Sequence, residues 1–306
     1  MFATKTQSHV IDLEDYKIVG DKPINRGAFG FIYLVENKTS KQRYAAKIIT
    51  TSSSIQQEIL VSREISILIR VQSPTIIRFY GFSPQDFGGY PNVTLLMEYK
   101  ENGSLKQLIE LEFKRQAPHE YDDTAKQIIL CGIAHGMMTL HSRRVLHRDL
   151  KPDNVLLDSN YHPCITDFGL SKFLDPSNSG NQSMSECGTP AYTAPEIFKG
   201  NHYGLKSDVY SFGILMYEVL VGEQAYREEL NPKHYNQYQF RQKIIEGQRP
   251  TLNGQIKPSF QSLLEQCWSE DPKDRPSFQE LFTKLSLSVA DDDETIMGTI
   301  FRIISD

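Results

Sequence analysis

Acidic and amide side chains recur over a short stretch in the middle of the chain. Asp149 and Asn154 lie within the run HRDLKPDN (147–154), the apolar segment 155–157 follows, and Asp167 comes soon after it. A strand, a turn and a second strand could bring these side chains together, and their hard oxygen atoms are ligands that Mg²⁺ prefers. Any one Asp is more often a turn residue or a helix cap. The recurrence as a whole indicates a magnesium site.

A lysine and a glutamate lie in apolar surroundings earlier in the chain. Alternation along the strand-like segment 44–49 places Lys47 on the same face as two apolar residues, so its ammonium group requires an anion. In the helical pattern that follows, Glu64 shares a row with Leu60 and Leu68 at a spacing of four residues. An isolated glutamate at the edge of an apolar stripe usually reaches solvent. Here it is also the candidate partner of Lys47.

A glycine-containing turn precedes both residues. Gly27 and Gly30 lie between two strand-like stretches, where missing side chains would let backbone N–H groups approach phosphate oxygens. This signal is weak alone, because glycines in a hairpin turn are usually structural. A strand follows the turn, which argues against a dinucleotide-binding βαβ unit.

The elements that must position these residues change character along the chain. Residues 16–99 read as short strands interrupted by one helix, and residues 104–287 read mainly as helices. The segment 208–221 is apolar nearly all round, as a helix surrounded by protein would be; Ser207 can cap its start and Gly222 follows its end. The order predicts an α+β fold of two lobes with a cleft between them.

Composition excludes several function classes. The 306 residues are 39% hydrophobic and 23% charged, enough for a substantial core, and the net charge of −5 argues against general nucleic-acid or membrane-surface binding. No stretch is apolar enough to span a membrane, and the polar start (1–15) does not resemble a signal peptide. The tail 288–306 is acidic and then apolar, and a docked helix is the expectation there. Four scattered cysteines suit a reducing compartment, so we expect a cytoplasmic protein.

The motifs HRDLKPDN, DFG (167–169) and APE (194–196), in this order and spacing, resemble those of the eukaryotic protein kinases. The resemblance covers about residues 16–287 and implies a bilobal fold. The small β-rich N-lobe (16–99) would carry one regulatory helix, and the larger C-lobe (104–287) would be mainly helical.

The resemblance implies a role for each matching residue. Asp149 would accept the proton of the substrate hydroxyl or orient its attacking oxygen, Lys151 would neutralise charge at the transferred γ-phosphate, and Asn154 and Asp167 would bind Mg²⁺. Lys47, paired with Glu64, would hold the α- and β-phosphates of ATP. The remaining ATP contacts would come from Ile24, Asn25, Gly27, Gly30, Ile32, Ala45, Leu156, the gatekeeper Met97 and the hinge residues Glu98 and Lys100.

The type of acceptor also follows from the resemblance. Lys151 and the loop 188–196 are similar to those of serine/threonine kinases, in which Thr189 would help to position the protein substrate. The segments 207–213 and 267–278 favour the tyrosine-kinase-like group of those enzymes, and Arg275 should pair with Glu196.

Two departures and a regulatory hypothesis complete the comparison. Asn25 replaces the usual first loop glycine, and Ala46 stands where the usual VAIK motif has Ile, so we expect a modest effect on ATP binding.

Arg148 would join a basic pocket for a phosphorylated activation loop, with phosphate added by an upstream kinase or by trans-autophosphorylation. The candidate sites are Ser183 and Ser185, and then Ser177 and Ser179, although any one of them could merely keep the loop soluble.

These residues predict an ATP- and Mg²⁺-dependent protein serine/threonine kinase that acts on protein substrates. The main alternative is a pseudokinase scaffold that binds nucleotide without efficient transfer. A small-molecule phosphotransferase of related fold is a third possibility, but it does not explain the APE motif or Arg275.

Overall fold

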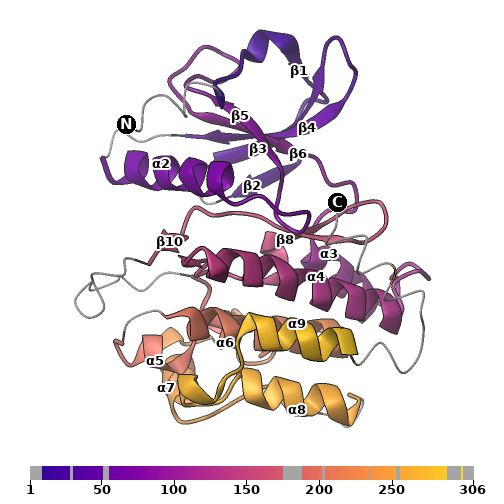
Figure 1. Ribbon diagram of the computed structural model, residues 1–306, viewed down its shortest axis with the longest axis vertical. Coiled ribbons are helices and arrows are strands. Elements are labelled where there is room, and N and C mark those ends of the chain that lie inside the picture. The colour runs from indigo at the N-terminus through magenta and orange to yellow at the C-terminus, as the bar shows by residue number, and fades with distance from the viewer. Residues whose placement is uncertain are drawn as a thin grey trace. The chain divides into compact units, whose positions relative to one another are not determined.

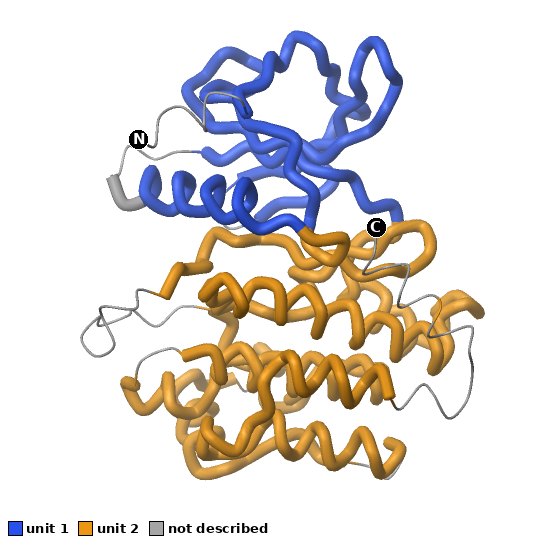
Figure 2. The backbone as a smooth tube through the Cα atoms, in the orientation of Figure 1, with its two compact units in different colours: residues 1–72, 77–101 blue, residues 73–76, 102–306 orange. Residues whose placement is uncertain are grey.

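The structure is a computed structural model that describes residues 9–27, 30–50, 55–174, 188–201, 204–233, 235–252, 256–287 and 298. The chain divides into two compact units (Figure 2). Unit 1 contains residues 1–72 and 77–101, and unit 2 contains residues 73–76 and 102–306.

Unit 1 is built on an antiparallel sheet with one long helix (Figure 1). The sheet order is β1-β3-β4-β6-β5, and β2 pairs with β3. Strands β3 and β4 form an antiparallel hairpin, with pairs from Gly30 opposite Ile49 to Glu36 opposite Arg43. The elements are η2 (Leu13–Asp15), β1 (Tyr16–Ile18), β2 (Asn25–Gly27), β3 (Gly30–Asn37), β4 (Arg43–Ile49), α2 (Ile55–Arg70), β5 (Phe79–Ser83) and β6 (Thr94–Glu98).

One side of this sheet carries an aromatic cluster. Tyr44 lies edge-on to Tyr16 and to Tyr80, with ring centroids 5.6 and 4.9 Å apart. The cluster closes over buried residues of β3, β4 and β6, and Ile11 packs against it from outside the sheet. Residues alternate in direction along a strand, so Lys47 projects from β4 on the other side.

Unit 2 is mainly helical and contains two small two-stranded sheets, β7 with β10 and β8 with β9. Its helices are α3 (Leu105–Phe113), α4 (Asp123–Ser142), α5 (Pro195–Phe198), α6 (Leu205–Val221), α7 (Gln237–Ile245), α8 (Pro258–Cys267) and α9 (Phe278–Leu287). The strands are β7 (Val145–Leu146), β8 (Val155–Leu157), β9 (Pro163–Ile165) and β10 (Lys172–Phe173), and the 3₁₀ turns are η3 (Pro152–Asn154), η4 (Pro190–Tyr192) and η5 (Pro272–Asp274).

Helix α6 forms the centre of unit 2, and nearly all of its residues are buried. The prediction that it starts after a Ser207 cap is wrong, because the helix begins at Leu205 with Gly204 as its N-cap. Ser207 lies inside the first turn, where its hydroxyl accepts from the Gly204 N–H and donates to Glu196. The end of the helix at Val221 agrees with the prediction.

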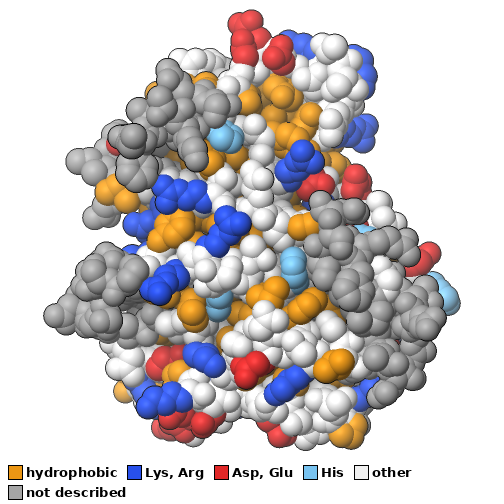
Figure 3. All heavy atoms as spheres, in the orientation of Figure 1, with side chains coloured by type: hydrophobic (Ala, Val, Ile, Leu, Met, Phe, Trp, Pro, Cys, Tyr) orange, Lys and Arg blue, Asp and Glu red, His pale blue; other side chains and the backbone are white. Residues whose placement is uncertain are grey.

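The surface over the last two helices carries charges of both signs. Over α8 and α9, Figure 3 shows Lys and Arg side chains mixed with Asp and Glu. Within the described ranges, no helix combines the length and apolar character that a membrane crossing requires.

Burial raises the pKa of Cys131 and Cys267 to about 12, so neither thiol is a ready nucleophile. Cys187 lies outside the described residues.

Candidate active site

The glycine hairpin of unit 1 is formed by β2 and β3, with Asn25 opposite Ile32 and Gly27 opposite Gly30. Only glycine fits at position 30. A Cβ atom at this position would lie 1.9 Å from the Ile48 carbonyl oxygen of β4. The backbone of the hairpin can therefore lie against β4 only if residue 30 has no side chain.

Lys47 and Glu64 form a buried ion pair inside unit 1. The Lys47 Nζ atom lies 2.7 Å from the Glu64 Oε1 atom, and the two side chains are 11% and 5% exposed. Burial of two charges is costly unless they are paired in good geometry. The pair fixes the lysine ammonium at the face of β4 that carries Ala45, where it can meet an anionic ligand.

The end of β6 provides the segment expected to serve as the hinge. Met97 is buried opposite Ala45 of β4, and Glu98 lies opposite Tyr44. The Glu98 N–H donates to the Arg78 carbonyl, and its side chain pairs with Lys100 at 2.8 Å. These contacts fix the backbone direction of the segment, while the contacts of its backbone with adenine remain a prediction.

In unit 2, four donors surround the carboxylate of Asp149. Its Oδ1 atom accepts from the N–H and hydroxyl groups of Thr189, each at 3.0 Å. Its Oδ2 atom lies 3.1 Å from the Asn154 amide nitrogen and 2.8 Å from the Lys151 ammonium nitrogen. Lys151 also donates to the Thr189 hydroxyl at 2.7 Å. The four side chains therefore form one network with a single carboxylate at its centre.

Asp208 of α6 anchors the loop that carries this network, and sequence reasoning did not identify that role. Its carboxylate accepts from the backbone N–H groups of His147 and Arg148 at 3.0 and 2.9 Å, and it lies 2.8 Å from the His141 ring nitrogen. Burial alone would raise the pKa of Asp208, but these partners outweigh it and the pKa lies below the usual value. The available signal was a carboxylate in the first turn of a mostly apolar helix.

The segment around Asp167 is tied to the same loop. Strand β8 pairs with β9, and the Thr166 N–H donates to the Asn154 carbonyl at 3.0 Å. Phe168 is fully buried with its ring 5.5 Å from that of His147. Asp167 has a positive φ of 63°, an uncommon conformation that is often found at functional sites. The predicted strand-turn-strand thus brings the DFG segment beside Asn154.

The two predicted metal ligands, Asn154 and Asp167, suit a metal ion that is coordinated by both protein and nucleotide better than one coordinated by protein alone. No group of three His, Cys, Asp or Glu side chains that could hold a metal occurs among the described residues. The Asn154 amide nitrogen is engaged by Asp149, which leaves the amide oxygen as its coordinating group. With Asp167 it offers hard oxygen ligands, and a bound nucleotide would have to supply further oxygens. The residues fit Mg²⁺ held together with ATP.

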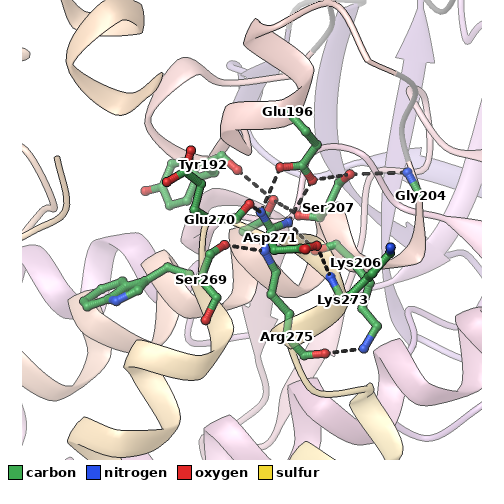
Figure 4. Close-up of polar contacts among 12 residues, drawn as sticks. Tyr192, Glu196, Gly204, Lys206, Ser207, Ser269, Glu270, Asp271, Lys273 and Arg275 are labelled. Carbon is green, nitrogen blue, oxygen red and sulfur yellow. Dashed lines mark hydrogen bonds and ion pairs between the residues drawn. The ribbon is translucent and has the colours of Figure 1, made fainter. Parts of the chain in front are cut away.

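Glu196 and Arg275 meet as expected, and Figure 4 shows their surroundings. The guanidinium donates to both carboxylate oxygens, at 2.7 and 2.8 Å, and the arginine side chain is fully buried. Ser207 of α6 donates to the same carboxylate. The ion pair therefore fixes α5, which directly follows the Thr189 segment, to α6 and the loop before α9.

The predicted residues fall into two groups. Unit 1 holds the glycine hairpin, the Lys47–Glu64 pair and the segment 97–100, and unit 2 holds the Asp149 network, Leu156 of β8 and Asp167. Ser177, Ser179, Ser183 and Ser185 lie outside the described residues.

Comparison with known proteins agrees with this geometry. A family model described as a protein kinase domain matches residues 18–285. A probable serine/threonine-protein kinase of Dictyostelium discoideum is 33% identical over 283 residues, which cover 90% of this chain and 20% of the relative. Mitogen-activated protein kinase kinase 1 of Arabidopsis thaliana is 30% identical over 297 residues, covering 96% and 79%. Human receptor-interacting serine/threonine-protein kinase 3 is 34% identical over 286 residues, covering 89% and 51%.

The chain thus spans a fifth of the first of these relatives, about half of the third and most of the second.

Proposed function

Because this chain belongs to the protein kinase family, we propose that it transfers the γ-phosphate of ATP to serine or threonine hydroxyls of protein substrates. The observation that carries the proposal is the Asp149 network, in which a buried carboxylate is oriented by Thr189, Asn154 and Lys151. We assign the kinase domain to residues 16–287, with an N-lobe at 16–99 and a C-lobe at 104–287.

Unit 1 would bind most of the nucleotide. The backbone N–H groups of the glycine hairpin would cover the phosphates, and Lys47, held by Glu64, would bind the α- and β-phosphates. Adenine would bond to the backbone of Glu98 and Lys100. Apolar contacts to the base would come from Ile24, Ile32, Ala45, Met97 and Leu156.

Unit 2 would carry the transfer step. The substrate hydroxyl oxygen forms a bond to the γ-phosphorus as the bond to the bridging oxygen of ADP breaks, and Asp149 orients or accepts the hydroxyl proton. Lys151 stabilises charge on the transferred phosphoryl group. Asn154 and Asp167 would hold Mg²⁺, which when bound neutralises phosphate charge. Placement and electrostatic stabilisation therefore supply most of the catalysis.

The segment from Thr189 to α5 supports a protein acceptor. Thr189 links the catalytic carboxylate to the segment before α5, and the Glu196–Arg275 pair anchors α5 to the core of unit 2. A kinase of this kind would belong to the tyrosine-kinase-like group and act in the cytoplasm.

Regulation by phosphorylation of the segment 175–187 forms part of the proposal. Lys172 of β10 precedes this segment closely in sequence, and the Arg148 guanidinium donates to the carbonyl of Leu170, just before β10. A phosphate on Ser183 or Ser185, or on Ser177 or Ser179, would form charge-assisted bonds with such basic groups. Either an upstream kinase or a second copy of the chain would add it.

The test uses purified chain, Mg²⁺, labelled ATP and a generic protein substrate. Asp149→Asn should lower incorporation into Ser and Thr at least about 100-fold, as expected for loss of a positioned base. Asp153→Asn is the matched control, because Asp153 lies on the same loop but is paired at the surface with Lys106. ATP binding without transfer in the unaltered chain would favour a pseudokinase scaffold, and equal activity of both variants would refute the role of Asp149.

A further inference from the structure

Strand β5 forms one edge of the unit 1 sheet, and a segment from outside the sheet lies along it (Figure 1). Val10 forms a parallel bridge with Phe82 of β5. The Ile11 N–H donates to the Phe82 carbonyl at 2.9 Å. An edge strand presents backbone donors and acceptors that can pair with an additional strand. Residues 9–11 use this edge in that way.

Gly81 of β5 creates the space for this contact. A Cβ atom at position 81 would lie 2.4 Å from the Ile11 Cγ2 atom and 2.5 Å from the His9 carbonyl oxygen. The added segment therefore passes directly over the glycine, closer than any other residue type would allow. The His9 ring stacks on Phe79 beside it, with ring centroids 6.2 Å apart.

The segment presents alternate side chains to the sheet, as an added strand does. His9 and Ile11 are partly buried, whereas Val10 between them is 50% exposed. Ile11 packs against the aromatic cluster that contains Tyr44 and Tyr80. The backbone of β5, the gap above Gly81 and the aromatic cluster together form a groove that accepts an extended chain with an apolar side chain at the Ile11 position.

We propose that this groove is a binding site for an extended peptide, filled in cis by residues 9–11 of the same chain. Recognition combines backbone hydrogen bonds with a pocket for one apolar side chain, which is the usual logic of strand addition. The docked contact is short, and the covalent link to η2 gives the segment a high local concentration. A peptide supplied in trans therefore has to compete with this segment. The inference does not depend on phosphoryl transfer.

The test uses the full chain and a labelled peptide with the sequence of residues 9–15. Ile11→Asp should displace the chain's own segment, because a carboxylate would lie against the aromatic cluster. This variant should bind the peptide at least tenfold more tightly than the unaltered chain does, as measured by fluorescence anisotropy. Val10→Asp is the matched control, since residue 10 points outward, and it should bind as weakly as the unaltered chain.

Two further measurements make the result decisive. A peptide with Asp in place of Ile should not bind, because its carboxylate would lie against the aromatic cluster. Adding Gly81→Ala to Ile11→Asp should abolish binding, because the new Cβ atom would block the groove. Equal binding by the Ile11→Asp and Val10→Asp chains would overturn the proposal. If Ile11→Asp does not fold, hydrogen exchange decides: Gly81→Ala alone should speed exchange of the Ile11 amide at least tenfold, and unchanged exchange would overturn the proposal.

Discussion

Replacement of Arg275 by methionine should destabilise unit 2 more than any surface charge change. All the N–H directions of the guanidinium are used: Nε donates to the Ser269 carbonyl, and the two terminal nitrogens donate to Glu196 and to the carbonyls of Lys206 and Glu270. Methionine fills a similar volume but leaves the Glu196 carboxylate buried without its cation. Removing one partner of a buried pair costs about 3–5 kcal/mol, and we expect a loss of that size.

A double-mutant cycle on the urea unfolding of the full chain checks this role of the ion pair. Arg275→Met and Glu196→Met should each be costly, whereas the double variant should cost at least about 2 kcal/mol less than the sum of the two. Lys199→Met is the control, because its contact with Glu270 is exposed, and its cost should stay below about 1 kcal/mol. Additive costs of the two core variants, or a loss below about 1 kcal/mol for Arg275→Met, would refute this account of the ion pair.

Three further predictions concern pH, the nucleotide loop and the catalytic network. Burial raises the pKa of Glu218 to about 8, so the folded protein retains a proton that the unfolded chain releases. The free energy of unfolding should therefore fall as pH rises from about 4.5 to 8. In urea titrations, Glu218→Gln should reduce the slope of that fall by about 1 kcal/mol per pH unit. Gly30→Ala should raise the KM for ATP about tenfold or more, since its Cβ would overlap the Ile48 carbonyl, and an unchanged KM would contradict the close approach. Thr189→Val should lower kcat about tenfold while Thr189→Ser retains it, because only serine keeps the hydroxyl between Lys151 and Asp149.

Local periodicity was enough to predict the pair in unit 1. Alternation placed Lys47 on one face of its strand, and the four-residue spacing placed Glu64 in the apolar row of the next helix. Each of these two patterns concerns a single element. Because a buried lysine also requires an anion, the contact between Lys47 and Glu64 at 2.7 Å follows from strand alternation, helix periodicity and the cost of burying an unpaired charge. The meeting of Glu196 with Arg275, 79 residues apart, was expected from family resemblance alone.

The anchoring of the catalytic loop could not be predicted in the same way. Asp208 lies 61 residues after His147, and no periodic pattern relates the two positions. The expected cap at Ser207 failed for a related reason, because its hydroxyl is engaged by Glu196 and the helix starts earlier, at Leu205. In both cases a tertiary partner determined what a polar side chain does, and local preference did not. A buried aspartate in an apolar helix nevertheless signals that donors from elsewhere must reach it.

The direction of the hydrogen bonds around Asp149 has a consequence for the transfer step. Thr189 accepts from Lys151, so its own hydroxyl proton points to Asp149, and the chain of donors runs in one direction toward the carboxylate. Asn154 and Lys151 donate to the other oxygen. The carboxylate is thus oriented before any substrate hydroxyl arrives, and Asp208 fixes the backbone beneath it. Because these donors are already in place, the carboxylate would need little reorganisation to orient a substrate hydroxyl in the proposed transfer, and such preorganisation is the condition under which fixed dipoles favour a transition state.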